Sequence, residues 1–463
     1  MAVHGTWRLG NGIERILCSS TAAMCHQMRK AAQERINSFD CTSRMLVSPR
    51  RYRRWWRWLF GPVLFARRGL HGHLSVLFIS CVLFFAVVDY LTFSTSSLAL
   101  SSRSSSSRVS ANTALVPGIR SIYVASTHWN NEAILRSHWN AAVVELARKF
   151  GKENIYVSVY ESGSWDDSKG ALRELDMQLG ELGVDRTIVL DPTTHENEIS
   201  KPPAEEGWID TARGKRELRR IPYLAHMRNK SLEPLEKLVR AGRTFDKIIF
   251  LNDVIFSMAD IITLLNTRSG SYAATCSLDF AKPGLFYDTF ALRDWKGSAA
   301  FSQRYPYFSA RRSRNALLAG KPIPVQSCWN GIAIFDAAPF QTTQTPLRFR
   351  AIPDSLAKYH LEGSECCLIH YDNPLSASKG VWLNPNVRVG YNLVAYESAA
   401  RGWPSTRDAV LVGWWKGFLA SLLDLPWRPR AIEARFKAWV KEEDDDTTSS
   451  SSSSSSQVGQ NCV

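Results

Sequence analysis

Two polar residues, Asn252 and Asp253, follow a short apolar segment at the point where a buried strand would end. They belong to Phe245–Phe256 (FDKIIFLNDVIF), whose apolar run Ile248–Leu251 predicts a strand. Ligands of open α/β sheets bind outside the carboxyl ends of the strands. An acidic residue in that place is suited to holding a cation against a phosphate. The alternative is an Asx turn that leads into the next helix.

Two further features suit a nucleotide. The segment ESGSWD follows a predicted strand, and its acids, Glu161 and Asp166, are placed to accept hydrogen bonds from ribose hydroxyls. A loop that only enters the next helix is the alternative. Arg228 precedes the Phe245–Phe256 strand and can neutralise a diphosphate.

Acids alternate with aromatic residues in Leu278–Trp295 (LDFAKPGLFYDTFALRDW). Its acids are Asp279, Asp288 and Asp294. This mixture suits a sugar, because apolar ring faces stack while hydroxyls donate to carboxylates. The alternative is a well-packed loop. In Gln326–Asp336 (QSCWNGIAIFD), a turn into a strand, Trp329 and Asn330 would lie at the mouth of the site.

The segment Ser364–Asp372 (SECCLIHYD) adds Glu365 and His370. If it were a strand, alternation would put Glu365 and Cys367 on one face and Cys366 on the other. His370 is a candidate metal ligand, and a structural histidine is the equal alternative. The predicted disulfide joins Cys328 to Cys366 or Cys367.

Strands and helices alternate along the segments that must position these residues. The predicted strands are 120–126, 154–160, 186–190, 248–251 and 272–276, and the predicted helices include 130–150, 168–182 and 258–266. This alternation predicts a Rossmann-like α/β fold, an open and mostly parallel sheet with flanking helices. The sequence has no GxxxxGK[ST] loop and no Rossmann glycine fingerprint, which argues against ATP hydrolysis and dinucleotide redox chemistry. GxSxG and HExxH motifs are also absent, so hydrolases of those kinds have no support.

The front of the chain predicts a membrane anchor. The net charge of this 463-residue chain is +14, and arginines crowd residues 50–68, just before an apolar stretch at 70–93. That stretch is long enough to cross a bilayer once, and the positive-inside rule puts the body on the lumenal side. A signal peptide and a buried helix are the alternatives. The Arg-Trp run at 50–58 alone would suit nucleic acid, which a lumenal body is not expected to meet.

We therefore predict five regions. They are a cytoplasmic, mostly disordered tail (1–69), a transmembrane signal-anchor helix (70–93), a Ser-rich stem (94–117), a lumenal catalytic domain (118–437) and an acidic, serine-rich disordered tail (438–463).

Five segments together resemble the fungal cryptococcal α-1,3-mannosyltransferase and capsule-associated family, glycosyltransferase family 69. They are ESGSWD, FLNDVIF, FYDTFALRD, CWNGIAIFD and SECCLIHYD, which occur in the family's order within about Gly118–Tyr391. The resemblance implies a GT-A-like fold in a type II Golgi membrane enzyme. It implies transfer of mannose from GDP-mannose to a mannose-containing glycan or glycolipid of the capsule or cell wall, with retention, in α-1,3 linkage.

The resemblance also implies roles for the candidate residues. Asn252-Asp253 would fill the place of the family's DxD motif, with Asp253 the chief protein ligand of Mn²⁺ or Mg²⁺. The expected donor-binding residues are Glu161, Asp166, Arg228, Asn252, Asp253, Trp329 and Asn330; the expected catalytic residues, which orient the acceptor hydroxyl, are Asp288, Asp294 and Glu365; the expected metal ligands are Asp253 and His370.

Two other functions remain open. The same fold can use another sugar nucleotide, such as UDP-xylose or UDP-glucose. A non-catalytic partner in capsule or wall export is favoured slightly by Asn252, an amide where the DxD motif has a carboxylate.

Overall fold

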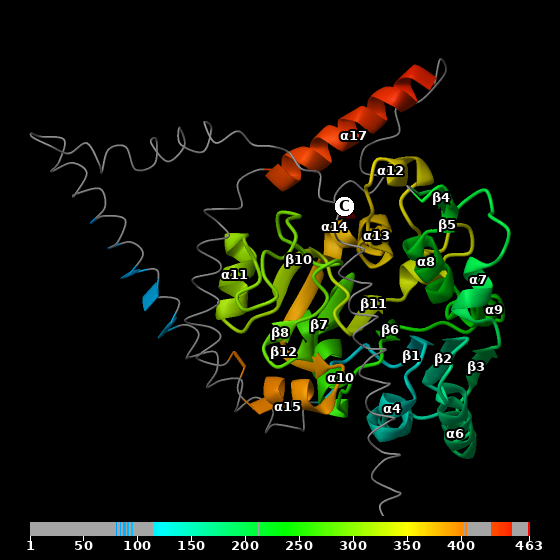
Figure 1. Ribbon diagram of the computed structural model, residues 1–463. Helices are drawn as coiled ribbons and strands as arrows, with labels where there is room; N and C mark the ends of the chain where they lie inside the picture. Colours follow the sequence, from blue (N-terminus) through cyan, green and yellow to red (C-terminus); the bar gives the residue numbers. More distant parts are fainter. Residues whose placement is uncertain are drawn as a thin grey trace, which may run out of the picture. The chain divides into compact units, whose positions relative to one another are not determined.

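The computed structural model describes residues 114–211, 213–401, 403–404, 427–446 and 462–463, and single residues between 80 and 95 (Figure 1). Contacts divide the chain into Met1–Phe85 and Ala86–Val463, and nearly all described residues belong to the second unit. The predicted tail 1–69, most of the predicted span 70–93 and most of the predicted stem 94–117 lie outside the described residues. Among the residues described, no helix has both the length and the apolar character needed to cross a membrane.

The first part of the domain is a βαβ array, as predicted. In chain order it consists of β1 (Ile122–His128), α4 (Glu132–Ile134), η1 (Leu135–Trp139), α5 (Asn140–Phe150), β2 (Ile155–Ser162), α6 (Ser168–Glu181) and β3 (Arg186–Asp191). The strand of the opening motif is β6 (Lys247–Leu251), which pairs in parallel with β1. The carboxyl ends of β1, β2 and β6 therefore lie at one edge of the sheet.

Short elements fill the chain between β3 and β6, and α10 follows β6. They are α7 (His195–Ile199), β4 (Trp208–Asp210), β5 (Arg216–Leu218), α8 (Arg220–Lys230), α9 (Glu233–Arg240), α10 (Met258–Leu265) and η2 (Thr267–Gly270). The strands β4 and β5 form a separate small sheet. The helix α8 carries Arg228 in its last turn.

The second part of the domain completes the sheet. Its elements are β7 (Ala274–Lys282), β8 (Leu285–Phe286), β9 (Arg293–Asp294), α11 (Arg311–Leu318), β10 (Ile323–Ser327), β11 (Ile332–Asp336), η3 (Ala338–Gln341), α12 (Asp354–Lys358), α13 (Glu365–Asp372), α14 (Ser376–Lys379), β12 (Val381–Gly390), α15 (Leu393–Arg401) and α17 (Trp427–Asp446). The ten strands have the order β3-β2-β1-β6-β11-β7-β12-β10-β9, with β8 beside β7.

The sheet is mixed rather than uniformly parallel, because β11 lies antiparallel between β6 and β7. The first residue of β11, Ile332, pairs with the last residue of β6, Leu251. The turn that enters β11 is therefore beside the residues that leave β6. This inserted strand brings Trp329 and Asn330 to Asn252 and Asp253, although 76 or more residues separate the two pairs.

Both faces of β6 are covered by side chains. Ile248 and Phe250 belong to one buried cluster, and Ile249 and Leu251 belong to the cluster on the opposite face. A strand covered on both sides is apolar at every position, which explains the continuous run that predicted it. The polar residues Asn252 and Asp253 follow directly after the part of the chain that is covered on both faces.

Two predictions about the second half of the domain are wrong. Residues 365–372 form a helix, α13, in place of the expected strand. The disulfides join Cys276 to Cys328 and Cys367 to Cys462, and Cys366 is a free, buried thiol. Cys366 does not pair with Cys328. It lies on the helix α13, where its thiol contacts the Glu365 carboxylate.

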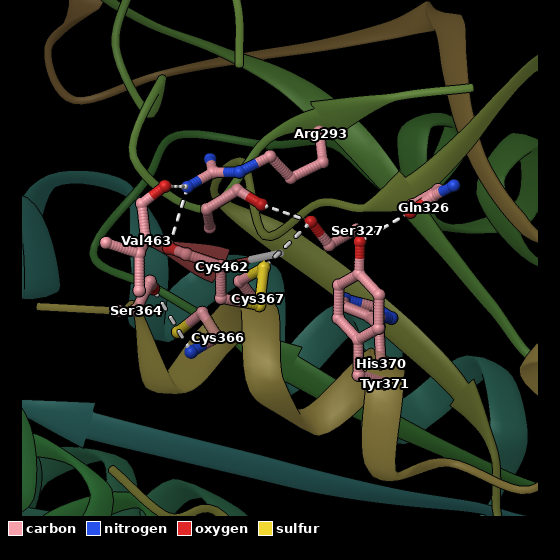
Figure 2. The surroundings of a disulfide bond; sticks show 12 residues. Arg293, Gln326, Ser327, Ser364, Cys366, Cys367, His370, Tyr371, Cys462 and Val463 are labelled. Atoms are coloured by element: carbon pink, nitrogen blue, oxygen red, sulfur yellow. Dashed lines mark hydrogen bonds between the residues drawn. A yellow bond between two sulfur atoms is a disulfide. The ribbon is translucent and has the colours of Figure 1, made fainter. Parts of the chain in front are cut away.

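The tail predicted at 438–463 is also partly ordered. The helix α17 continues through Asp446 because Phe436 and Trp439 pack against Ile352 and Leu356 of the domain. Figure 2 shows Cys462 bonded to Cys367 on α13, with the Arg293 guanidinium donating to the Cys462 carbonyl oxygen at 2.7 Å. The end of the chain is thus fastened to the helix that carries Glu365.

Replacing Cys462 with serine is expected to lower the free energy of unfolding by about 2–4 kcal/mol, because the bridge closes a segment of 95 residues. Thermal unfolding of the full chain measures the effect, and Cys18→Ser, outside the described residues, is the matched control. Equal melting temperatures of C462S and the wild type would contradict this bridge.

Candidate active site

The centre of the candidate site is Asp253, just beyond β6. One of its carboxylate oxygens accepts a hydrogen bond from the Asn131 side-chain amide at 2.9 Å. Burial raises the pKa of Asp253 to about 6, while the Asn131 amide and the positive charge of Arg228 act to lower it. The preceding residue, Asn252, accepts the Trp329 indole N–H at 3.1 Å through its side-chain oxygen. Asn252 therefore positions Trp329, and Asp253 carries the charge.

The turn Cys328–Gly331 forms the second wall of the site. Gly331 accepts a hydrogen bond from the Asn252 N–H at 2.9 Å. Its φ is +82°, and a Cβ there would lie 2.6 Å from Val389, so glycine is required. Asn330 is fully buried and also has positive φ, +46°. Its side-chain amide donates to the Asp288 carbonyl oxygen at 2.9 Å, which ties the turn to the acidic loop.

Arg228 brings a positive charge to this wall. Its guanidinium donates to the Glu365 carboxylate at 3.0 Å and lies 4.4 Å from the centre of the Trp329 ring. Glu365 is 3% exposed, so the ion pair is largely shielded from water. A shielded pair of this kind fixes the orientation of both groups and leaves the remaining guanidinium N–H groups as donors for an anion.

Two aspartates form the acidic part of the site. Asp279 accepts the Asp288 N–H at 3.2 Å and the Tyr391 hydroxyl at 3.1 Å. Asp288 accepts the N–H groups of Phe290 and Ala291 at 3.1 Å each, both through the same carboxylate oxygen. Burial and the neighbouring Asp288 charge raise the pKa of Asp279 to about 7. Burial and the Glu365 charge likewise raise the pKa of Asp288.

The raised pKa of Asp279 predicts a pH dependence of stability. The unfolded-state pKa is about 4, so Asp279 favours the folded state below that pH, and this contribution is lost as the pH rises through about 7. Asp279→Asn removes this pH-dependent loss of stability, because asparagine does not ionise. Relative to the wild type, the variant is expected to gain on the order of 4 kcal/mol in unfolding free energy between pH 4 and pH 8, because the folded and unfolded pKa values differ by about 3. Urea unfolding across that range measures it, and a constant difference between the two proteins would contradict it.

The structure places Glu161 and Asp166 in the loop after β2 and gives them internal partners. Glu161 is fully buried, accepts the Ser164 N–H and pairs with Lys169 at 2.7 Å. Asp166 accepts the Glu132 N–H at 3.0 Å and the Ser168 hydroxyl at 2.6 Å. Partial burial acts to raise the pKa of Asp166, but these hydrogen bonds hold it below its usual value. Both acids shape the loop, and the expected bonds to ribose hydroxyls are not available to Glu161.

Two predicted site residues are not brought to Asp253. Asp294 is buried in its own loop, where its oxygens accept the N–H groups of Lys296, Ser298 and Ala310. His370 is buried beside Phe335, with one ring nitrogen 2.6 Å from the Cys328 carbonyl oxygen. Burial lowers the pKa of His370 to about 4. Both residues therefore support the fold, Asp294 as a loop acceptor and His370 as a core histidine.

The sequence reasoning missed two residues of the site. Asn131 supports Asp253, and Tyr391 connects Asp279 to Asn252, whose amide lies 3.5 Å from the tyrosine hydroxyl. Asn131 follows β1, so the strand-end rule applied to β1 as well as β6 would have found it. Tyr391 follows β12, whose parallel pairing with β7 no local pattern reveals.

The candidate site could hold a divalent cation with Asp253 as its protein ligand. Among the described residues, three possible metal-binding side chains converge only at Cys276, Cys328 and His370, and the two cysteines there are joined in a disulfide. Asp253 offers one carboxylate, and the Asn252 oxygen is engaged by Trp329. Mg²⁺ is commonly bound by one or two carboxylates together with substrate phosphates and water. The donor set fits an ion of that kind.

The sequence model of the cryptococcal mannosyltransferase 1 family matches residues 121–372, more than half of the chain, and the chain therefore belongs to this family. The α-1,3-mannosyltransferase CMT1 of Cryptococcus neoformans is 27% identical over 276 residues, 56% of this chain. The chain spans 55% of that relative's length. The matched region contains Asp253, Arg228, Asp288 and Glu365.

Solved structures with similar chain traces include a mannosyltransferase and a UDP complex of TarS. The mannosyltransferase PcManGT of Pyrobaculum calidifontis, in complex with GDP-Man and Mn²⁺, is 12% identical, with 75% of this chain and 87% of that chain covered and a TM-score of 0.36. Staphylococcus aureus TarS 1–349, in complex with UDP, is 11% identical, with 58% and 60% covered and a TM-score of 0.31.

Proposed function

We propose that this chain is a mannosyltransferase that transfers mannose from GDP-mannose to a hydroxyl of a mannose-containing glycan or glycolipid, in α-1,3 linkage and with retention. The observation that carries the proposal is the convergence of Asp253, Arg228, Asp288 and Glu365 at one edge of the sheet. All four lie in the region matched by a mannosyltransferase family. The activity named for the Cryptococcus relative supports the sugar and the linkage.

The diphosphate of the donor would lie between Asp253 and Arg228. Arg228 is fixed by Glu365 and Trp329, so its free N–H groups are oriented before the donor arrives. Such preorganised charge stabilises the negative charge that develops on the departing diphosphate. Asp253 would hold Mn²⁺ or Mg²⁺ against the same phosphates, and the bound ion would neutralise part of that charge.

The acceptor would lie against the loop that carries Asp288. Tyr287 and Phe290 flank this acid and are 54% and 46% exposed, which offers apolar faces to a sugar ring. Asp288 uses one oxygen for the N–H groups of Phe290 and Ala291. Its other oxygen has no hydrogen-bond partner recorded in the described part of the chain and would accept the proton of the acceptor hydroxyl. Asp279 and Tyr391 keep this loop in place.

We also propose that the protein is a single-pass type II protein of the Golgi membrane with a lumenal catalytic domain. The proposal rests on the apolar stretch 70–93 and the arginines that precede it. The two disulfides of the domain are consistent with an oxidising compartment. Protease protection of the domain in sealed vesicles tests the topology, and digestion of the domain without detergent would contradict it.

The donor assignment is tested by offering the full chain GDP-mannose, UDP-xylose and UDP-glucose with an α-mannoside acceptor and Mn²⁺. We expect product with GDP-mannose alone. Transfer from a UDP-sugar instead would keep the enzyme class and overturn the donor. Failure to bind any nucleotide diphosphate in calorimetry would favour a non-catalytic partner.

A further inference from the structure

Two exposed tryptophans, Trp129 and Trp165, lie in contact just beyond the carboxyl ends of β1 and β2. Their side chains are 43% and 67% exposed, and their ring centres are 5.2 Å apart with planes inclined by 69°. Burial of a large aromatic side chain is favourable, and tryptophan is enriched at binding interfaces. The roles proposed for Asp253, Arg228, Asp288 and Glu365 do not involve either ring.

The backbone holds this tryptophan pair in place. The Trp129 N–H donates to the Asn131 side-chain oxygen at 3.0 Å, and the Trp165 N–H donates to the Asn130 side-chain oxygen at 2.8 Å. Asn130 has a φ of +52°, a left-handed conformation that brings the two loops together. The rings are thus presented on two loops that are locked to each other, which lowers the entropic cost of binding a flat ligand.

The same asparagines connect the tryptophan pair to Asp253. The Asn131 amide contacts the Trp129 backbone through its oxygen and the Asp253 carboxylate through its nitrogen, at 3.0 and 2.9 Å. The Asn131 side chain therefore links the Trp129 backbone directly to the candidate metal ligand, Asp253. If the diphosphate of the donor is held at Asp253, its nucleoside would need to reach only the neighbouring loop that carries Trp129.

The order of the strands decides which end of the donor faces the tryptophans. On one side of β6 lie β1 and β2, which carry the tryptophan pair; on the other side lie β11 and β7, with Asp279. The transferred sugar must lie on the side of Asp288 and Glu365, where the acids and Arg228 converge. The nucleoside, at the opposite end of the diphosphate, must then extend toward β1 and β2.

We propose that Trp129 and Trp165 form the platform on which the nucleobase of the donor stacks, and this proposal rests on the proposed function. A base offers a flat π-face to either indole ring, and such stacking requires no hydrogen-bonding side chain. The acids of the two loops are consistent with this, because Glu161 and Asp166 are engaged within the loop and the more exposed Glu132 and Asp167 pair with Arg136. An acceptor sugar would need free carboxylates beside the rings, and those lie on the other side of β6.

The test compares GDP with inorganic pyrophosphate, which has the phosphates but no base. Binding of each to the full chain is measured by calorimetry with Mn²⁺, for the wild type, W129A/W165A, W129F/W165F and the control W295A. Trp295 is also 44% exposed but stacks on Arg312 and lies outside the site. We expect W129A/W165A to bind GDP at least about ten-fold more weakly and pyrophosphate as the wild type does, because only the stacked base is lost.

The phenylalanine variant is expected to recover most of the GDP affinity, and W295A to bind both ligands normally. Equal GDP affinity in W129A/W165A and the wild type would overturn the platform while leaving the proposed donor intact. Equal loss of GDP and pyrophosphate would overturn it in favour of a structural role for the two rings. A wild-type chain that binds pyrophosphate but no nucleotide would overturn both this platform and the proposed function.

Discussion

Asp253→Asn is expected to lower mannosyl transfer by about 10³-fold or more while the domain stays folded. The substitution removes the one charge at the carboxyl end of β6 and keeps the acceptor oxygen that Asn131 contacts. A cation that stabilises a departing diphosphate contributes several kcal/mol to the transition state, and each 1.4 kcal/mol is a factor of ten in rate. Initial rates with GDP-mannose at saturating Mn²⁺ measure the effect, and circular dichroism checks the fold.

The matched control for Asp253→Asn is Asp185→Asn. Asp185 precedes β3 at the opposite edge of the sheet and pairs with Arg243 on the surface. We expect its variant to keep wild-type transfer. The Mn²⁺ titration adds a second readout, since D253N should require far more Mn²⁺ for any residual activity. Wild-type rates in D253N would remove Asp253 from the metal site.

Asp288→Asn is expected to reduce kcat by about 10²-fold and to leave the affinity for GDP unchanged. Asparagine keeps the oxygen that accepts the Phe290 and Ala291 N–H groups, so the loop conformation should survive. What it loses is the basic oxygen that would take the proton of the acceptor hydroxyl, and proton transfer of this kind contributes about 10²–10⁴-fold. Steady-state kinetics with varied acceptor, together with GDP calorimetry, measure the two effects separately.

The outcome that would contradict this role of Asp288 is a parallel loss of GDP affinity and turnover. That result would place Asp288 with the donor rather than the acceptor. Asp294→Asn gives a useful comparison, because Asp294 satisfies backbone N–H groups in its own loop. It is expected to lower the melting temperature, with activity per folded molecule retained.

The sequence was sufficient to predict the elements around Asp253 whose signals are local. The apolar run of β6 and the turn to Asn252 and Asp253 lie within twelve residues, and the strands and helices around β1 to β3 repeat a simple alternation. The same local reasoning assigned the strand β11. These features position half of the candidate site.

The remaining features depend on contacts between distant segments. The antiparallel insertion of β11 between β6 and β7 follows from the whole order of the sheet. Asp294 and His370 have the residue types of a catalytic acid and a metal ligand, and only tertiary contacts reveal that they support a loop and the core. The sequence does not reveal the helix α13, because its residues Glu365–His370 are all buried and show no alternation of polar and apolar positions at helical spacing.

We propose that Asp253 and the groups around it form the donor site of a GDP-mannose-dependent transferase. The most direct measurement is release of GDP coupled to formation of a mannoside, followed for the wild type and D253N side by side with one α-mannoside acceptor. We expect an α-linked product and stoichiometric GDP from the wild type, and almost none from D253N. Folded wild-type protein that releases no GDP, or equal product from both proteins, would contradict it.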